Sequence, residues 1–249
     1  MAVRIVFLGS KPIGYQCLRF LLEQKEVLDI EISAVRTRLR REFGGEDNDL
    51  AVLAAAHHIP LLNSLDELPE CDLIYSVQHH ELLREAHIAR AKHIAVNLHL
   101  APLPEYRGCN QFSFAIMDQA PGFGVTLHAI DTRIDHGDIL FERRFPIPEN
   151  CWVNELYELS FDAAITLFRE SLAPLLSGNY TRTPQAALLE ERGTSLHFRE
   201  EIQALKQIDL GGDEQSILRA IRATYMPGFE PPYTLIDGKK VYFSLEEGA

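Results

Sequence analysis

The sequence predicts an α/β fold in which a Rossmann-like, mostly parallel sheet is flanked by helices and followed by a small C-terminal helix and β-hairpin region. Short apolar runs typical of buried strands alternate with helical patterns along the chain, and this alternation indicates parallel pairing with right-handed crossovers. The first run, residues 3–8, ends at Gly9 and leads directly into a helix, which is the opening unit of a doubly wound sheet. The composition changes after Pro184, so we expect two parts, residues 1–184 and residues 185–249.

The other elements follow from periodicity and turn residues. Apolar residues at helical spacing over 153–176 predict one long helix, and Asp237-Gly238 between two extended runs predicts a closing hairpin. The charged segment 36–49 indicates an exposed loop whose charges are solvated. The remaining expected strands are residues 30–35, 72–77, 94–98, a run from 124 and 138–147, and the remaining expected helices follow Gly9, cover 49–57 and 215–223, and precede residue 124.

The charge balance disfavours two classes of partner. With 24 basic and 36 acidic residues the net charge is −12, which opposes non-specific attraction to nucleic acid or to an anionic membrane surface. A signal-peptide pattern and a run of about 18 apolar residues are both absent from the sequence, so a cytoplasmic protein without a membrane span is expected. The cysteines are far apart and form no Cys-x-x-Cys pair, so neither a disulfide framework nor a structural metal site is expected. They are Cys17, Cys71, Cys109 and Cys151.

Polar side chains gather at the ends of two neighbouring strands. Asn97 and His99 are two residues apart in one strand, so their side chains emerge on the same side and can share a site. Asp135 follows the strand that begins near residue 124. An amide that donates hydrogen bonds, an imidazole that accepts a proton and a carboxylate that orients it suit acyl transfer onto an amine. Each residue alone is a weak signal, because such residues are common at turns and strand ends.

Together these residues resemble the formyltransferases that use N10-formyltetrahydrofolate, whose shared pattern is Asn-x-His on one strand and Asp in a following Leu/Ile-Asp-x-Gly loop. Here the pattern reads Asn97-Leu98-His99 and Ile134-Asp135-His136-Gly137, and the similarity extends over roughly residues 3–180. The resemblance implies an N-formyltransferase whose catalytic domain is residues 1–184, with N10-formyltetrahydrofolate as co-substrate and no metal. In this interpretation His99 is the general base, Asn97 donates to the oxyanion, and Asp135 holds the imidazole or an ordered water in place.

The resemblance places the folate pocket on two loops. Val77-Gln78-His79-His80 would bind the cofactor mainly through backbone groups, and the loop before Asp135 would form the opposite wall. The paired histidines also invite a metal interpretation, which we disfavour because adjacent residues on an extended chain point opposite ways and no third ligand is evident. The cofactor-binding residues expected in the second loop are Ile130, Asp131, Arg133 and Ile134.

The segment after His99, residues 100–108, is similar to the Leu-Pro-x-x-x-Gly loop of the same family, which implies the acceptor side of the site. Its two prolines fix the path of the chain and so steady the strand end that presents His99. An ordinary surface position for Arg107 remains an alternative. The acceptor-side residues expected here are Glu105, Tyr106, Arg107, Gly108, Asn110 and Gln111.

A second candidate for contact with the acceptor lies at the start of the chain. Ser10, Lys11 and Pro12 follow the first strand at a helix N-terminus, where anions are favoured. A solvated turn explains these residues equally well. The turn lacks the full Gly-x-Gly-x-x-Gly pattern, so we exclude a dinucleotide site.

A third candidate lies in the tail. Arg219 and Arg222 are one helical turn apart and, with Tyr225, would embrace a base and a diphosphate. The alternative is that Tyr225 and Phe229 simply pack the tail onto the main domain.

The family includes enzymes that act on a purine precursor, on the methionine of initiator tRNA and on amino sugars. The tRNA enzymes look longer, with a basic C-terminal barrel, and the purine enzyme carries a Gly-rich phosphate loop that Gly9-Ser10-Lys11 does not match. We therefore expect an amino-sugar acceptor, nucleotide-linked, in lipopolysaccharide or other surface-glycan biosynthesis, and a homodimer formed through the apolar C-terminal hairpin. The alternatives are a methionyl-tRNA formyltransferase-like enzyme, a simple sugar acid as acceptor, and a catalytically silent protein that binds ligands in the folate cleft.

Overall fold

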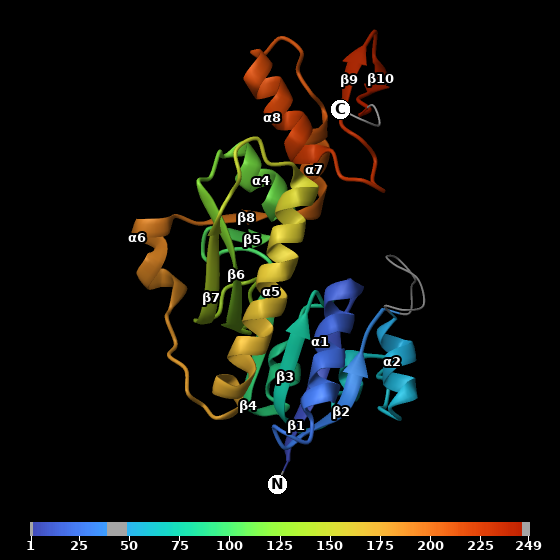
Figure 1. Ribbon diagram of the computed structural model, residues 1–249, viewed down its shortest axis with the longest axis vertical. Coiled ribbons are helices and arrows are strands. Elements are labelled where there is room, and N and C mark those ends of the chain that lie inside the picture. The colour runs from blue at the N-terminus through green and yellow to red at the C-terminus, as the bar shows by residue number, and fades with distance from the viewer. Residues whose placement is uncertain (1, 39–48, 246–249) are drawn as a thin grey trace.

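A computed structural model describes residues 2–38 and 49–245 of the protein (Figure 1). A six-stranded sheet with the order β2-β1-β3-β4-β6-β7 forms its centre. The first four strands in this order pair in parallel, whereas the β4–β6 and β6–β7 pairs are antiparallel. The predicted α/β fold with a mostly parallel sheet is therefore confirmed. The strands of this sheet are β1 (Val3–Gly9), β2 (Ile30–Arg36), β3 (Cys71–Val77), β4 (Ala91–His99), β6 (Gly122–Ala129) and β7 (Ile139–Pro146).

Helices α1 and α5 pack on the central sheet. Figure 1 shows the long helix α5 running beside α1, and the two helices are in contact. Within the described residues, no helix has both the length and the apolar character needed to span a membrane. The α-helices are α1 (Lys11–Gln24), α2 (Leu50–Ala56), α3 (Glu85–Ile88), α4 (Gln111–Met117), α5 (Val153–Leu176), α6 (Leu189–Arg192), α7 (Ile202–Lys206) and α8 (Glu214–Thr224). Short 3-10 turns span Leu65–Glu67, Gln185–Leu188 and Arg199–Glu201.

Both faces of the parallel part of the sheet are buried, which explains why its strands read as continuous apolar runs. In β1, Ile5 and Phe7 belong to the core under α1 and α5, while Val6 and Leu8 belong to a second cluster on the opposite face. This division follows the two-residue repeat of a strand.

Most expected elements lie where the sequence predicted them. The long helix has the predicted bounds, and the closing hairpin consists of β9 (Tyr233–Ile236) and β10 (Lys239–Tyr242). The predicted loop 36–49 falls largely on residues 39–48, which lie outside the described residues. Arg36 itself ends β2, and its guanidinium lies 2.8 Å from the Glu81 carboxylate, so the expectation that its charge is solvated is wrong.

The C-terminal region returns to the sheet end that carries the predicted site, a contact that the sequence did not predict. β5 (Tyr106–Gly108) pairs in parallel with β8 (Ser195–His197). The Gln185 side chain donates hydrogen bonds to the carbonyl oxygens of Asp135 and Gly137, at 3.0 and 2.9 Å. The division at residue 184 remains a prediction, and these contacts cross it.

Gly137 follows the predicted catalytic loop and packs against the backbone of β6. A methyl group at this position would lie 1.9 Å from the carbonyl oxygen of Ala129, far inside van der Waals contact. We expect Gly137→Ala to lower the free energy of unfolding by about 3 kcal/mol in urea denaturation, because overpacking against backbone forces the chain to shift. The matched control is Gly212→Ala, whose nearest neighbour atom lies 3.6 Å from the new methyl group and which should change stability little. Equal stabilities of the two variants would contradict this account.

Candidate active site

The structure brings Asn97, His99 and Asp135 together at the carboxyl end of β4. Asn97 and His99 project from β4 at the predicted two-residue spacing, and Asp135 lies in the loop that follows β6. The Asn97 amide Nδ2 lies 3.4 Å from Asp135 Oδ1, and His99 Nδ1 lies 3.6 Å from Asp135 Oδ2. The strand β6 ends at Ala129, six residues before Asp135, so the carboxylate sits on a loop rather than at a strand end.

A backbone carbonyl fixes the orientation of the His99 ring. His99 Nε2 lies 2.8 Å from the carbonyl oxygen of Tyr106. A carbonyl oxygen only accepts hydrogen bonds, so Nε2 carries a proton, and the neutral ring has its lone pair on Nδ1. Nδ1 is the nitrogen that faces Asp135, and this leaves it as the atom able to accept a proton.

Three neighbours fix the orientation of the Asn97 amide. The hydroxyl of Ser76 donates to Asn97 Oδ1 over 2.9 Å, and Asn97 Nδ2 lies 3.1 Å from Nε2 of His128. His128 Nδ1 lies 2.8 Å from the Ala129 carbonyl oxygen, so its proton is on Nδ1 and its Nε2 accepts from the amide. The amide hydrogens of Asn97 therefore point toward His128 and Asp135, at the centre of the site.

Sequence reasoning missed His128, a buried residue that lies directly opposite Asn97 in the β4–β6 pair. A weak signal for it was present, because Thr126 and His128 are polar residues two positions apart in an otherwise apolar strand. Only the strand pairing shows that this polar face meets Asn97.

The Asp135 carboxylate is ionised within a buried cluster. Burial alone would raise its pKa, but the positive charge that His99 and His128 can carry, with the hydrogen bond from the backbone N–H of Gly108, outweighs burial and holds the pKa well below its ordinary value. The Gly108 N–H donates to Oδ2 over 2.9 Å. Gly108 has a φ of +84°, and a Cβ there would lie 2.2 Å from the carbonyl oxygen of His197, so only glycine brings this N–H to the carboxylate.

The expected acceptor loop contributes backbone more than side chains. The Tyr106 side chain is buried against Phe123, with ring centroids 5.8 Å apart, and its hydroxyl donates to Asp118 over 3.1 Å. Glu105 forms an ion pair with Arg144 at 2.6 Å. Both residues line a cavity of about 790 Å³, and the three predicted catalytic residues are not among its lining residues. Contact of Glu105 and Tyr106 with the acceptor stays a prediction, and their side chains line this cavity rather than the catalytic cluster.

The other acceptor-side residues are placed in different ways. Gly108 touches the cluster through its N–H, and Arg107 beside it has a buried Nε with no hydrogen-bond partner among the described residues. Asn110 binds the C-terminal region, since its Nδ2 donates to the Phe198 carbonyl oxygen over 2.8 Å. Gln111 is buried at the start of α4.

Ser10 and Lys11 lie against the predicted cofactor loop. The Ser10 hydroxyl donates to the carbonyl oxygen of Gln78, and Lys11 Nζ donates to Gln78 Oε1 over 2.9 Å. Pro12 stands in the first turn of α1. These contacts join the predicted acceptor residues at the start of the chain to the loop after Val77.

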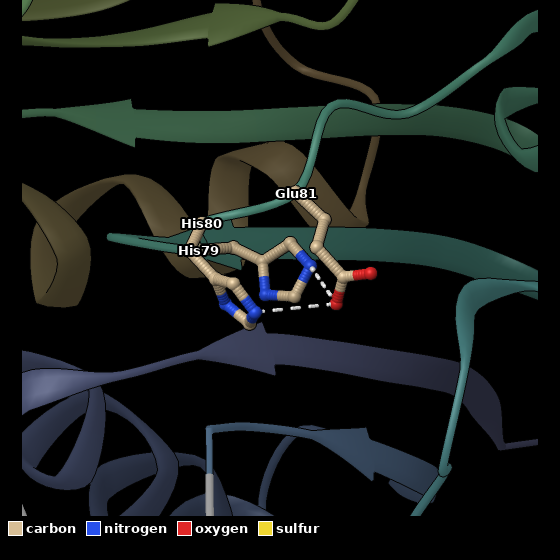
Figure 2. A group of neighbouring side chains, drawn as sticks. All are labelled: His79, His80 and Glu81. Atoms are coloured by element: carbon tan, nitrogen blue, oxygen red, sulfur yellow. Dashed lines mark ion pairs between the residues drawn. The ribbon is translucent and has the colours of Figure 1, made fainter. Parts of the chain in front are cut away.

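His79 and His80 point to the same region, as Figure 2 shows. Their ring nitrogens and a carboxylate oxygen of Glu81 all lie within 4.8 Å of one another. The prediction that the two rings point opposite ways with no third ligand is wrong, because Gln78 has a φ of +53° and the chain leaves β3 without continuing as a strand. Neither ring nitrogen of His79 has a hydrogen-bond partner in the part of the chain that the structure describes.

The buried His79 gives the protein a predictable acid sensitivity. Burial lowers its pKa to about 3, assisted by the charges of His80, Arg36 and Arg38, whereas an unfolded histidine has a pKa near 6.5. The unfolded chain therefore binds a proton below about pH 6.5 that the folded protein excludes. As the pH is lowered from about 6.5 to about 3, the free energy of unfolding decreases by at most about 1.4 kcal/mol per pH unit. We expect His79→Phe, which has no such proton, to lose less stability than the wild type between pH 7 and pH 4 in denaturant titrations. Parallel curves for the two proteins would contradict burial of a neutral imidazole.

The loop expected to face the cofactor is held together internally. Asp131 Oδ1 accepts from the Arg133 backbone N–H over 2.8 Å, and Asp131 Oδ2 lies 2.9 Å from His136 Nδ1. The Ile130 N–H donates to the Ala95 carbonyl oxygen over 2.8 Å, which ties the loop to β4. A cavity of about 690 Å³ adjoins both predicted cofactor loops and is lined by Ser64, Leu65, Asp66, Glu81, Leu82, Leu83, Arg84, Glu85, His87 and Thr132.

The tail residues pack on the larger part of the protein. The Tyr225 ring meets Trp152 edge-on, with centroids 6.2 Å apart, and α8 contacts α4 and α5. Arg219 and Arg222 lie on α8, and Phe229 is half exposed. The packing alternative is thus observed for Tyr225.

Comparisons with known proteins find similarity to formyltransferases. Residues 55–170 match the family model for formyl transferase. The chain is 28% identical to a methionyl-tRNA formyltransferase of Halalkalibacterium halodurans over 95% of its own length and 76% of that protein. It is 30% identical to a GDP-perosamine N-formyltransferase of Brucella melitensis biotype 1, over 69% of its own length and 63% of that protein.

Among solved structures, the fold is similar to that of a sugar 3N-formyl transferase, WlaRD, determined in the presence of dTDP and 5-N-formyl-THF. The TM-score is 0.80 at 21% sequence identity, with 97% of this chain and 85% of the other covered. The family match includes Asn97, His99 and Asp135, the residues that the structure gathers at one end of β4. On the family model and the two relatives, residues 55–170 of the chain form a formyl transferase domain.

Proposed function

We propose that the protein transfers the formyl group of N10-formyltetrahydrofolate to the amino group of a nucleotide-linked amino sugar, in the cytoplasm and for glycan biosynthesis. The observation that carries the proposal is the meeting of an oriented amide, an oriented imidazole and an ionised carboxylate in a chain that carries a formyl transferase domain.

The geometry supports a role for each of the three side chains. The substrate amine attacks the formyl carbon. The Asn97 Nδ2 hydrogens face the region where the oxyanion develops, and one of them would leave its long 3.4 Å contact with Asp135 to donate to the oxyanion. His99 accepts the amine proton on Nδ1, because Nε2 already donates to a carbonyl oxygen. Asp135 stabilises the resulting imidazolium. The new C–N bond forms first and gives the tetrahedral oxyanion; its collapse breaks the bond from the formyl carbon to N10, and His99 passes the proton to N10 of the departing tetrahydrofolate.

The cavity of about 690 Å³ supports a cofactor site between the two predicted loops. Residues after β3 line one side of this cavity. Thr132 also lines it and belongs to the loop that contains Ile130, Asp131, Arg133 and Ile134. We assign the donor to this cavity, because part of its lining follows β3, and β3 pairs with β4, which carries Asn97 and His99. The acceptor then approaches from the side of Gly108 and Arg107.

The C-terminal region supports a second part of the proposal, a homodimer. The hairpin carries large apolar side chains that are between 45% and 57% exposed, at Leu235, Ile236, Val241 and Tyr242. A self-complementary contact through this face would cover them.

The nature of the acceptor separates two candidates. An amino sugar is supported by the GDP-perosamine relative and by the sugar N-formyl transferase structure, which matches 97% of this chain, including the C-terminal region. Initiator methionyl-tRNA is supported by the relatives that match 95% of the chain. The net charge of −12 weighs against tRNA, whose backbone requires a broad basic face.

One experiment separates these functions. The purified protein is incubated with N10-formyltetrahydrofolate and either a panel of GDP- and dTDP-linked amino sugars or initiator methionyl-tRNA. Tetrahydrofolate release is followed by absorbance, and the formylated product is identified by mass spectrometry. Turnover with an amino sugar alone is expected. Turnover with the tRNA alone would overturn the sugar assignment, and folate binding without turnover on any acceptor would identify a silent binding protein.

A further inference from the structure

A second site lies in the loop after β3, apart from the catalytic cluster. We propose that His79, His80 and Glu81 bind a divalent transition-metal ion, with Zn²⁺ and a water molecule at the fourth position as the best fit. The inference goes beyond the proposed formyl transfer, which requires no metal, and it rests on the geometry and the chemistry of these three side chains.

The three donor atoms already lie close to a metal-binding arrangement. Glu81 Oε1 is 3.7 Å from His79 Nε2 and 3.4 Å from His80 Nε2. Ligands at about 2.0 to 2.1 Å from a tetrahedral Zn²⁺ are about 3.4 Å apart. The third edge, between the two rings, is at most 4.8 Å, so a small rotation of the more exposed His80 ring completes the arrangement. Figure 2 shows both rings facing the carboxylate, with the two dashed lines meeting at one carboxylate oxygen of Glu81.

The donor set has the chemistry that such an ion requires. Two imidazole nitrogens and one carboxylate oxygen, with one position left for water, are typical of zinc sites with an open coordination position. The His79 side chain is 1% exposed, and both its ring nitrogens lack a hydrogen-bond partner within residues 2–38 and 49–245. Because no described residue occupies either nitrogen with a hydrogen bond, the ring can offer a lone pair to a metal.

Arg36, which is not a ligand, orients the Glu81 carboxylate and lowers the expected affinity for the metal ion. Arg36 donates to Glu81 Oε1 through Nη2 at 2.8 Å and Nε at 3.1 Å. Such a contact holds a ligand in place, as residues around metal sites commonly do. Its positive charge also opposes a cation nearby, so the affinity should be weaker than that of the same three ligands without the arginine.

Because the ligands are consecutive residues, a bound ion would fix the backbone of this loop. Gln78, immediately before them, is joined to Ser10 and Lys11, and Glu81 lines the cavity assigned to the donor. A metal here therefore stiffens one wall of that cavity without touching the catalytic cluster.

The test measures metal binding in the absence of any substrate. The full chain is freed of metal with a chelator and desalted, and Zn²⁺ affinity is measured by competition with a chromophoric chelator. Co²⁺ replaces Zn²⁺ in a parallel titration, since tetrahedral Co²⁺ gives intense visible absorption bands. We expect about one ion per chain, and His80→Ala and Glu81→Gln should each weaken binding by at least about tenfold. Both substituted side chains are partly exposed, and circular dichroism verifies that the variants fold.

The chain offers a matched control in His57 and His58, another pair of adjacent histidines, which is exposed. The double variant His57→Gln/His58→Asn should leave Zn²⁺ affinity and the Co²⁺ spectrum unchanged. Binding that is lost in this control, or that survives in both Glu81→Gln and His80→Ala, would overturn the proposal, as would the absence of binding to the wild type. None of these outcomes bears on formyl transfer, because no acceptor or folate is present in the titration.

Discussion

We expect the His99→Asn variant to turn over about 10³-fold more slowly than the wild type while binding folate with nearly unchanged affinity. Asparagine places an amide atom near the position of Nδ1 but does not reach that of Nε2, and an amide cannot accept the amine proton as Nδ1 of the imidazole does. His99 is hydrogen-bonded to the carbonyl oxygen of Tyr106 and does not belong to the predicted cofactor loops, so the pocket for the formyl donor should be preserved. The measurement is kcat for tetrahydrofolate release with a saturating acceptor, together with a folate binding titration.

The matched control is His93→Asn, the same substitution at an exposed position of the same strand, β4. It should leave both kcat and folate affinity unchanged. If His99→Asn also turned over at the wild-type rate, His99 would have no part in proton transfer and the proposed mechanism would fail.

We expect Asp135→Asn to lower kcat by about 10²- to 10⁴-fold, although the substitution changes the size of the side chain very little. An amide oxygen in the place of Oδ2 can still accept the N–H of Gly108, but it carries no negative charge to stabilise the imidazolium of His99. The amide nitrogen would then take the place of Oδ1 and face Asn97 Nδ2, which is itself a donor. The corresponding change in Ser-His-Asp enzymes, which also removes the carboxylate beside an imidazole, lowers kcat by about 10⁴-fold. An unaltered kcat would show that the carboxylate plays no part in preparing the imidazole.

The same variant tests the electrostatics of the cluster through stability. The pKa of Asp135 is lowered in the folded protein, so ionisation contributes stability above the unfolded pKa near 3.8 and this contribution is lost as the pH falls toward the folded value. Asp135→Asn lacks the charge at every pH. We therefore expect the variant to be less stable than the wild type at pH 7 in denaturant titrations, with a gap that narrows below about pH 4. A gap that widens toward acid would contradict the lowered pKa.

The sequence was informative wherever a local repeat decides the structure. Continuous apolar runs placed the parallel strands because both faces of that sheet are buried, and the apolar spacing of α5 gave the bounds of the longest helix. The two-residue repeat of β4 put Asn97 and His99 on one side, and the Ile-Asp-x-Gly pattern supplied Asp135.

What the sequence did not predict depends on contacts between distant segments or on a single backbone angle. His128 joins the cluster only through the β4–β6 pairing, and the side chain of Tyr106 turns toward Phe123 while its carbonyl serves His99. The positive φ of Gln78 brings His79, His80 and Glu81 together, and a rule for extended chains fails there. Three-residue strands such as β5 and β8 carry too little pattern to be recognised in advance.

The pairing of β5 with β8 has a consequence for how the protein is made. The Ser195 N–H and hydroxyl both donate to the Glu105 carbonyl oxygen, and the Cys109 N–H donates to that of His197, so the segment presenting the Tyr106 carbonyl and the Gly108 N–H is clamped from both ends. A nascent chain cannot form this clamp until His197 has left the ribosome. The catalytic centre, whose own residues end at Asp135, is thus completed late in synthesis, after the sheet beneath it has had the opportunity to fold.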